Sequence, residues 1–302
     1  MNELHTGTVC SGYGGFYQVQ VNMDWTVECK PRGRLKKTHE KIYPGDQVEI
    51  SLLPDGTGMI ECIGPRRTAL RRPNIVNFDR IVIVLAWTLP DYDLLLLDRM
   101  LVLANQGGVQ PLICFNKMDL LQPSQRQDFR VIQACYQQSG YTVLPISAHQ
   151  PNTIEQLRSH LQGGLSVLAG PSGVGKSSLI NALLGREQEE TGAVSDRLRR
   201  GKHTTRYARI SPLGNTEAEG FIADTPGFFI LDFPEDFRPE QLPQYYPEFA
   251  YYPGCRFDGC LHKREPDCAI KQAVEQGKIN EDRYNRYLRL LEELQTREVH
   301  YG

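Results

Sequence analysis

The sequence predicts a multi-domain chain made of a small N-terminal β-barrel, a central α/β domain with a mostly parallel sheet, and a mostly helical C-terminal module. Three patterns lead to this division. Short alternating runs separated by turn residues come first, continuous apolar runs alternating with helical patterns follow, and a Cys/His cluster precedes a charged amphipathic helix. We place the boundaries at 1–66 for the barrel, 67–77 for a linker, 78–232 for the α/β domain and 233–302 for the C-terminal module.

Composition argues for an ordinary globular protein. The 302 residues are 40% hydrophobic and 23% charged, and the net charge of −2 means that any contact with nucleic acid must use local patches. The first five residues lack the apolar core of a signal peptide, and no apolar run approaches membrane-spanning length. Eight cysteines, scattered except for three near the C-terminus, are not a disulfide framework. We therefore expect a reduced, cytoplasmic protein that contacts no membrane.

The first 66 residues show about five short strand patterns, including 16–21 and 46–51, separated by turn signals such as Gly14-Gly15 and Asp55-Gly56. This number of strands favours an OB-fold, a small barrel that commonly binds oligonucleotides. The barrel contains a basic run, 30–37. Taken alone, such a run is more often a solvated charged loop than a binding site.

The next segment, 66–73, is basic and polar and contains a proline, which favours a domain boundary. From there the pattern changes to that of a doubly wound parallel sheet. Strands are expected at 81–86, 109–115, 141–146 and 165–169, and helices at 93–105, 124–139 and 153–161.

The most specific motif is the stretch Gly170–Ser178, which fits the phosphate-binding pattern G-x-x-x-x-G-K-S/T between a predicted strand and a helix expected over 178–184. Its glycines let the backbone wrap a phosphate chain, and N–H groups at the helix N-terminus point at it. Lys176 is expected to reach the β- and γ-phosphates as a catalytic residue, and the Ser177 hydroxyl to ligate Mg²⁺. The candidate phosphate-binding residues are Gly170, Pro171, Ser172, Gly173, Val174, Gly175, Lys176, Ser177 and Ser178.

A second motif, Asn116-Lys117-Met118-Asp119, follows a predicted strand and matches the N-K-x-D signature of GTP-binding proteins. One carboxylate can accept hydrogen bonds from both the N1–H and the exocyclic amine of guanine, whereas adenine has no donor at N1. Asn116 would brace the loop, and the Lys117 stem would cover the base. Ser147-Ala148 follows the next strand, where the Ala148 N–H can meet the guanine carbonyl. Together these residues predict a guanine site.

Asp224-Thr-Pro-Gly227 ends a further apolar run and matches D-x-x-G, in which Asp224 would hold Mg²⁺ through water and the Gly227 N–H would sense the γ-phosphate. Upstream, Thr205 is the favoured switch-loop magnesium ligand and catalytic residue, with Thr204 as the alternative. The order of the motifs is unusual, since in ordinary GTPases the phosphate elements precede the base-reading elements. The same parts therefore appear circularly permuted.

Cys255, Cys260, His262 and Cys268 match a structural zinc site in ligand type and number. Their spacing is not that of a common zinc finger, so three buried cysteines and a surface histidine remain the alternative. A catalytic metal is disfavoured because four protein ligands leave no open position. The helix expected over 280–297 carries an apolar stripe that should pack on its own module: Tyr284, Tyr287, Leu288, Leu291 and Leu294.

Together, the OB-like barrel, the permuted motifs and the C-x₄-C-x-H-x₅-C cluster resemble one family over nearly the whole chain. It is the ribosome small-subunit-dependent GTPase A (RsgA) family of bacterial circularly permuted GTPases. The resemblance implies GTP hydrolysis stimulated by the 30S ribosomal subunit and a role in late 30S maturation. It also implies contacts with 16S rRNA through the barrel and the zinc module. We further expect a monomer that binds GTP and GDP and holds Mg²⁺ and one structural zinc ion.

The resemblance makes two basic stretches better candidates for RNA contact than their composition alone does. The candidate residues are Lys30, Arg32, Arg34, Lys36, Lys37, Arg199, Arg200 and Lys202. Two other functions stay open at this point. The chain could be a nucleotide-gated RNA-binding module with incidental hydrolysis, or a P-loop ATPase or small-substrate kinase, although Asp119 argues against the latter.

Activation of the attacking water is the least determined part. Many GTPases place a glutamine directly after D-x-x-G, but Phe228 stands there in this chain and cannot hydrogen-bond water. The missing group must come from elsewhere, and His203 is the best candidate because an imidazole can orient water near neutral pH. The alternative is that His203 is a surface histidine in a basic RNA-binding loop.

Overall fold

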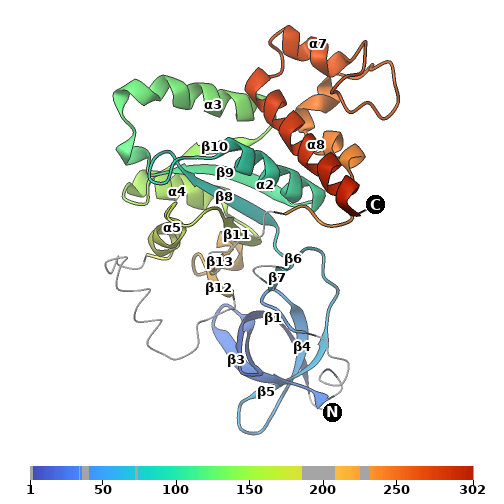
Figure 1. Ribbon diagram of the computed structural model, residues 1–302. Helices are drawn as coiled ribbons and strands as arrows, with labels where there is room; N and C mark the ends of the chain where they lie inside the picture. Colours follow the sequence, from blue (N-terminus) through green and yellow to red (C-terminus); the bar gives the residue numbers. More distant parts are fainter. Residues whose placement is uncertain are drawn as a thin grey trace.

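The computed structural model describes residues 3–33, 35, 41–71, 74–185, 208–224 and 232–301. Figure 1 shows the barrel, the central sheet and the C-terminal helices as three stacked parts, with the N-terminus beside the barrel. Several of the residues predicted above to be functional lie outside the described ranges: Arg34, Lys36, Lys37, Arg199, Arg200, Lys202, His203, Thr204, Thr205 and Gly227.

The N-terminal strands form a closed five-stranded barrel in the order β1-β2-β3-β5-β4. Neighbouring strands are antiparallel except β3 and β5, and β1 closes the barrel against β4. Alternation places valines and isoleucines inside, so that Val19, Ile50 and Ile60 are completely buried. The predicted barrel is therefore confirmed. Its strands are β1 (Leu4–Tyr13), β2 (Phe16–Asn22), β3 (Trp25–Pro31), β4 (Gln47–Leu52) and β5 (Gly58–Ile63).

The segment predicted as a basic linker holds an ordered hairpin of β6 (Ala69–Arg71) and β7 (Asn74–Val76). The hairpin docks on a turn of the barrel, where the Val76 N–H donates to the Pro44 carbonyl at 3.0 Å. Gly45 is required there because its φ is +94° and an added Cβ would lie 1.9 Å from the Val76 oxygen. The basic composition also has a structural use, since the Arg66 guanidinium lies 2.7 Å from the buried Asp46 carboxylate.

The central sheet has six strands in the order β10-β9-β8-β11-β13-β12, all parallel except the edge strand β12. This confirms the expected mostly parallel sheet. Strands β8, β9 and β11 are almost completely buried, as their continuous apolar runs predict. The strands are β8 (Arg80–Ala86), β9 (Gln110–Asn116), β10 (Thr142–Pro145), β11 (Leu165–Ala169), β12 (Arg209–Pro212) and β13 (Phe221–Asp224).

Helices cover both faces of the sheet, and each face has its own apolar core. On one face lie α2 (Leu94–Gln106) and α3 (Arg126–Gln138), and on the other lie α4 (Pro151–His160) and α5 (Lys176–Leu183). The α5 helix begins two residues earlier than expected, since Lys176 already belongs to its first turn. Short 3-10 turns complete this part: η1 (Met118–Leu120), η2 (Pro123–Gln125) and η3 (Glu217–Glu219).

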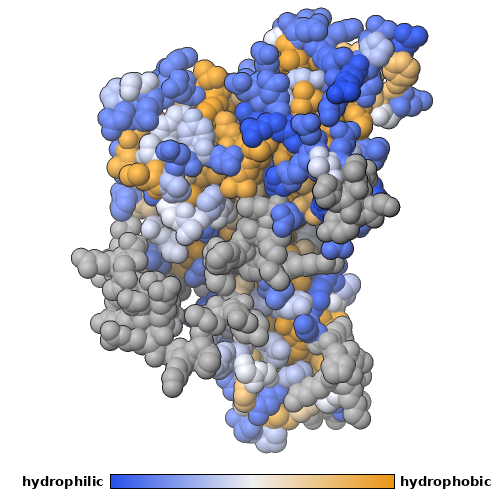
Figure 2. Space-filling view, viewed as in Figure 1, coloured by the Kyte–Doolittle hydropathy of each residue, from blue (hydrophilic) through white to orange (hydrophobic). Residues whose placement is uncertain are grey.

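The C-terminal module consists of η4 (Pro239–Tyr245), η5 (Pro247–Tyr251), α7 (Ala269–Glu275) and α8 (Glu281–Tyr301). Its outer end around α7 is mainly hydrophilic in the space-filling view (Figure 2). The predicted apolar stripe of α8 packs within this module, but the same core also includes Val102 of α2. The stripe therefore joins the module to the sheet domain as well as stabilising the module itself.

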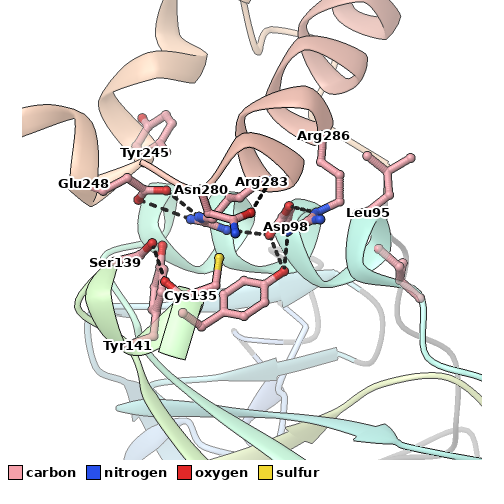
Figure 3. A network of polar contacts seen from close by, with 12 residues as sticks. Leu95, Asp98, Cys135, Ser139, Tyr141, Tyr245, Glu248, Asn280, Arg283 and Arg286 are labelled. Carbon is pink, nitrogen blue, oxygen red and sulfur yellow. Dashed lines mark hydrogen bonds and ion pairs between the residues drawn. The ribbon is translucent and has the colours of Figure 1, made fainter. Parts of the chain in front are cut away.

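Buried charges reinforce this junction (Figure 3). The Arg283 guanidinium of α8, only 2% exposed, lies 2.5 Å from the Asp98 carboxylate of α2 and also bonds the Glu248 carboxylate of η5. Arg286 reaches the second Asp98 oxygen at 2.6 Å. Burial alone would lower the pKa of Arg283, but Asp98 and Glu248 raise it well above its ordinary value. Two cations therefore balance two carboxylates inside the junction.

Candidate functional site

Five parallel strands end at one edge of the sheet, and the predicted nucleotide motifs begin at four of these ends. Ala169 precedes the phosphate loop, Asn116 and Asp224 are themselves terminal residues of β9 and β13, and Pro145 comes two residues before Ser147. The carboxyl edge of an open α/β sheet is where such folds bind ligands. Motifs separated along the chain are thus brought to one place.

The phosphate loop has backbone geometry that only glycine provides. Gly170 has φ +143°, and a Cβ there would lie 2.1 Å from the Val84 carbonyl oxygen; at Gly175, with φ +93°, it would lie 2.3 Å from Asn116 Nδ2. The Lys176 ammonium lies inside the loop and donates to the carbonyls of Gly170 at 2.8 Å and Pro171 at 2.7 Å. Partial burial lowers the pKa of Lys176 from its ordinary value.

The two base-reading segments contact each other directly. Ser147, fully buried, donates from its hydroxyl to Asp119 Oδ1 at 2.5 Å. The loops are also joined through their backbones, since the Met118 N–H donates to the Ile146 carbonyl at 3.1 Å. Asp119 itself is exposed. The carboxylate is therefore fixed in place while remaining accessible.

Asn116 connects the base-reading segment to the phosphate loop. Its amide Nδ2 donates to the Val174 carbonyl at 2.8 Å, and the side chain is 1% exposed. Among the described residues its Oδ1 has no hydrogen-bond partner, which is unusual for a buried acceptor. The hydrogen bond from Asn116 to Val174 therefore holds the base-reading segment next to the phosphate loop.

A further loop, 87–93 between β8 and α2, reaches the same edge and was not expected from the sequence. The Leu89 carbonyl accepts a hydrogen bond from the Lys117 ammonium, and Pro90 lies near Gly173 of the phosphate loop. Leu89 is 74% exposed, and Trp87 stacks on Tyr92 with ring centroids 4.5 Å apart. Its aromatic residues could have drawn attention to this loop, but they resemble ordinary core residues in the sequence.

The magnesium candidates are only partly described. Ser177 lies exposed in the first turn of α5, and Asp224 ends β13 beside Arg209 of β12. The third candidate, Thr205, and the sensing residue Gly227 lie outside the described residues. The joint role of the three magnesium candidates therefore stays a prediction.

Cys255, Cys260, His262 and Cys268 form a compact cluster in the C-terminal module, with all four ligand atoms within 4.8 Å of one another. The distances are 3.9 Å between the sulfurs of Cys255 and Cys268, 3.6 Å from Cys255 Sγ to His262 Nδ1, and 3.3 Å from that nitrogen to Cys268 Sγ. A tetrahedral zinc ion requires sulfurs about 3.8 Å apart and sulfur–nitrogen distances of about 3.6 Å. The donor set and its geometry therefore fit zinc.

The α8 helix holds the loop that carries the histidine. The Tyr284 hydroxyl donates to the His262 carbonyl at 2.5 Å, and the Tyr287 hydroxyl donates to the Leu261 carbonyl at 2.7 Å. Glu265 accepts three backbone N–H groups of the same loop. Burial lowers the pKa of His262, which favours the neutral imidazole that a metal ion needs.

Of the predicted RNA-binding residues, the structure describes Lys30 and Arg32. Lys30 Nζ lies 4.6 Å from the centroid of the Phe16 ring, and Arg32 forms an ion pair with Glu61. Phe16 pairs across the hairpin with Tyr13, whose side chain is 68% exposed. These two aromatic residues lie on one face beside Lys30, and a pattern of basic residues alone does not indicate them.

Comparisons with known proteins cover almost the whole chain. Residues 63–234 match the RsgA GTPase family, and residues 6–60 match the RsgA N-terminal domain. A protein of Clostridium botulinum named small ribosomal subunit biogenesis GTPase RsgA is 39% identical over 293 residues, which are 96% of this chain and 98% of that protein. A protein of the same name from Moorella thermoacetica is 43% identical over 294 residues, 97% of this chain and 98% of its own.

Two solved structures have the same arrangement of elements. YjeQ from Thermotoga maritima matches with a TM-score of 0.81 and 33% identity, over 97% of this chain and 99% of that one. YloQ, described as a circularly permuted GTPase, matches with a TM-score of 0.81 and 31% identity, over 98% and 96% of the two chains. Within the described ranges, no helix is both long and apolar enough to cross a membrane.

Proposed function

The chain belongs to the RsgA GTPase family, and we propose that it hydrolyses GTP during the maturation of the small ribosomal subunit. The observation that carries this proposal is the contact between the two base-reading segments beside the phosphate loop. Asp119 is held by Ser147 at 2.5 Å, and Asn116 joins the same segment to Val174 at 2.8 Å. Because the relatives are named small ribosomal subunit biogenesis GTPases, we expect purified small subunits to raise the turnover of GTP by this chain. They should not affect any ATP turnover.

Guanine recognition is assigned to the accessible Asp119 carboxylate and the Ala148 N–H. The carboxylate can accept from the N1–H and the exocyclic amine of guanine, whereas in adenine it would face the N1 lone pair. This argument disfavours the ATPase or kinase alternative. The phosphates would lie against the loop of 170–178, where the Lys176 ammonium balances their charge and Ser177, Thr205 and Asp224 hold Mg²⁺.

We assign to His203 the orientation of the attacking water, since Phe228 follows the D-x-x-G motif. In this proposal the ribosomal RNA phosphates bind the basic residues beside His203 and so hold the imidazole at the γ-phosphate. The basic residues Arg199, Arg200 and Lys202 would supply that contact.

Replacing His203 by alanine should lower the 30S-stimulated GTP turnover by about a hundredfold, the contribution expected of a positioned acid–base group. Affinity for GTP and for 30S subunits should stay at the parent level, because phosphates and RNA are held by other residues. His160→Ala, at an exposed end of α4, is the control. Normal stimulated turnover in the His203 variant would remove this residue from the mechanism and point to a group of the RNA.

A contact of the barrel with 16S rRNA is supported by the exposed row of Tyr13, Phe16 and Lys30, which offers rings for base stacking and a cation for phosphate.

A nucleotide-gated RNA-binding module with incidental hydrolysis would use the same surface. The two functions differ in kinetics. In a GTPase, cleavage of bound GTP in a single turnover precedes and drives release from the subunit, whereas in the module release needs only nucleotide exchange. A monomer working in the cytoplasm fits either function.

Zinc in the C-terminal module would be structural, because the four protein ligands fill a tetrahedral ion. Cys260→Ser should remove most of the bound zinc and increase hydrogen exchange beyond about residue 240, while leaving GDP affinity nearly unchanged. Cys62→Ser in the barrel, far from the cluster in sequence, should change neither zinc content nor exchange. Elemental analysis that finds no zinc in the freshly purified parent would rule this assignment out.

A further inference from the structure

The loop of Ser147 to His149 is held in place by several hydrogen bonds, and most of them involve Ser147. Ser147 is completely buried, and both its backbone and its hydroxyl are used. The hydroxyl donates to Asp119 Oδ1 at 2.5 Å and accepts from the His149 N–H at 3.2 Å. Its carbonyl accepts from the Gln150 N–H at 3.1 Å.

The remaining polar group of Ser147, its N–H, is satisfied by a residue of the next helix. It donates to Thr153 Oγ1 at 3.0 Å. The same hydroxyl lies 2.9 Å from the carbonyl oxygens of both Ser147 and Gln150, and its single proton can go to one of them. Thr153 stands in the first turn of α4, whose Ile154 and Leu157 are anchored in the core. A rigid helix thereby fixes the loop at the N–H of Ser147.

The loop leaves two groups available to a base. Within the part of the chain that the structure describes, the Ser147 N–H donates to Thr153 of α4 and the His149 N–H donates to the Ser147 hydroxyl, whereas the Ala148 N–H between them has no protein acceptor. The other available group is the Asp119 carboxylate, whose position depends on the Ser147 hydroxyl. Both groups are therefore placed indirectly by Thr153.

We propose that Thr153 is a positioning residue that sets the selectivity for guanine. The inference rests on the proposed guanine site and adds to it a residue that touches neither base nor phosphate. Without the Thr153 hydroxyl, the buried Ser147 N–H loses its acceptor and the loop is free to shift. A shift moves the Ala148 N–H away from the guanine carbonyl and moves Asp119 through Ser147, while the phosphate loop keeps its own contacts.

The test compares Thr153→Val, which has the same shape without the hydroxyl, with Thr153→Ser, which keeps the hydroxyl. Dissociation constants for GDP, IDP and ADP are measured by calorimetry on the full-length protein, with thermal unfolding as a check on folding. IDP lacks the exocyclic amine that Asp119 would accept from, and ADP lacks the carbonyl that Ala148 would donate to. We expect Thr153→Val to weaken GDP about tenfold and to leave ADP unchanged, so that both the GDP/ADP and the GDP/IDP preferences shrink. Thr153→Ser should restore both preferences.

Three results would overturn the inference. Unchanged GDP affinity in Thr153→Val would show that the loop needs no such anchor. Equal weakening of GDP, IDP and ADP would show that the hydroxyl only supports the fold. If the parent itself failed to prefer GDP to ADP, the guanine site would be wrong and this inference would fall with it. A parent that prefers GDP with an unaltered valine variant would remove only the role of Thr153.

Discussion

Asp119→Asn should lower the affinity for GTP by about a hundredfold, because two charge-assisted hydrogen bonds of roughly 1.5–3 kcal/mol each are at stake. The amide that replaces the Asp119 carboxylate can place an N–H donor opposite the N1–H and the exocyclic amine of guanine, which are donors as well. Xanthine carries a carbonyl in place of the exocyclic amine, so the amide donor suits it and XTP should bind the variant better than it binds the parent. Competition of labelled GDP by GTP and XTP measures both changes.

Asp128→Asn provides the matched control for Asp119→Asn. It removes one exposed carboxylate from the first turn of α3 in the same domain. Asp128 belongs to neither of the two base-reading segments. It should therefore leave both nucleotide affinities at the parent level. Should Asp119→Asn bind GTP as tightly as the parent does, the carboxylate does not read the base.

Arg283→Met should be the most destabilising of the substitutions considered, at about 3–5 kcal/mol, because it leaves the buried Glu248 carboxylate without its cation. Asp98 would keep Arg286 and the Tyr136 hydroxyl, at 2.6 Å and 2.7 Å, but Glu248 would lose the partner that bonds both of its oxygens. The damage should appear as increased hydrogen exchange in η5 and α8 and as a lower unfolding temperature.

Two further variants show whether the buried charge is the cause. Adding Glu248→Gln to Arg283→Met removes the orphaned carboxylate and should recover part of the lost stability. Arg67→Met breaks an ion pair with Asp79 in which the arginine side chain is 66% exposed, and it should cost no more than about 1 kcal/mol. A double variant as unstable as the single one would show that lost packing, rather than unpaired charge, is the cause.

The sequence predicts the fold well because its signals are local. A strand such as 165–169 and the glycine-rich loop that follows it lie within one short stretch, so this motif can be recognised without knowledge of any distant contact. Likewise, the four residues of the Cys/His cluster lie within fourteen positions, so their spacing already indicates a metal site.

What the sequence could not predict depends on contacts between distant segments. The ion pair between Asp98 and Arg283 joins residues 185 positions apart, and each looks like an ordinary charged residue of an amphipathic helix. Thr153 carries no motif of its own, and its role appears only when α4 is seen against Ser147. The sequence pattern of α8 predicts its apolar stripe, but it does not indicate that the stripe shares a core with Val102 of α2.

We infer that this chain is a GTPase whose activity serves the small ribosomal subunit. Its most direct test is the steady-state turnover of GTP by the purified full-length protein, with and without purified 30S subunits and with 50S subunits as the control. The account predicts slow hydrolysis alone, a large increase with 30S subunits, and none with 50S subunits or with ATP as substrate. Equal GTP turnover in the presence and absence of 30S subunits would contradict it.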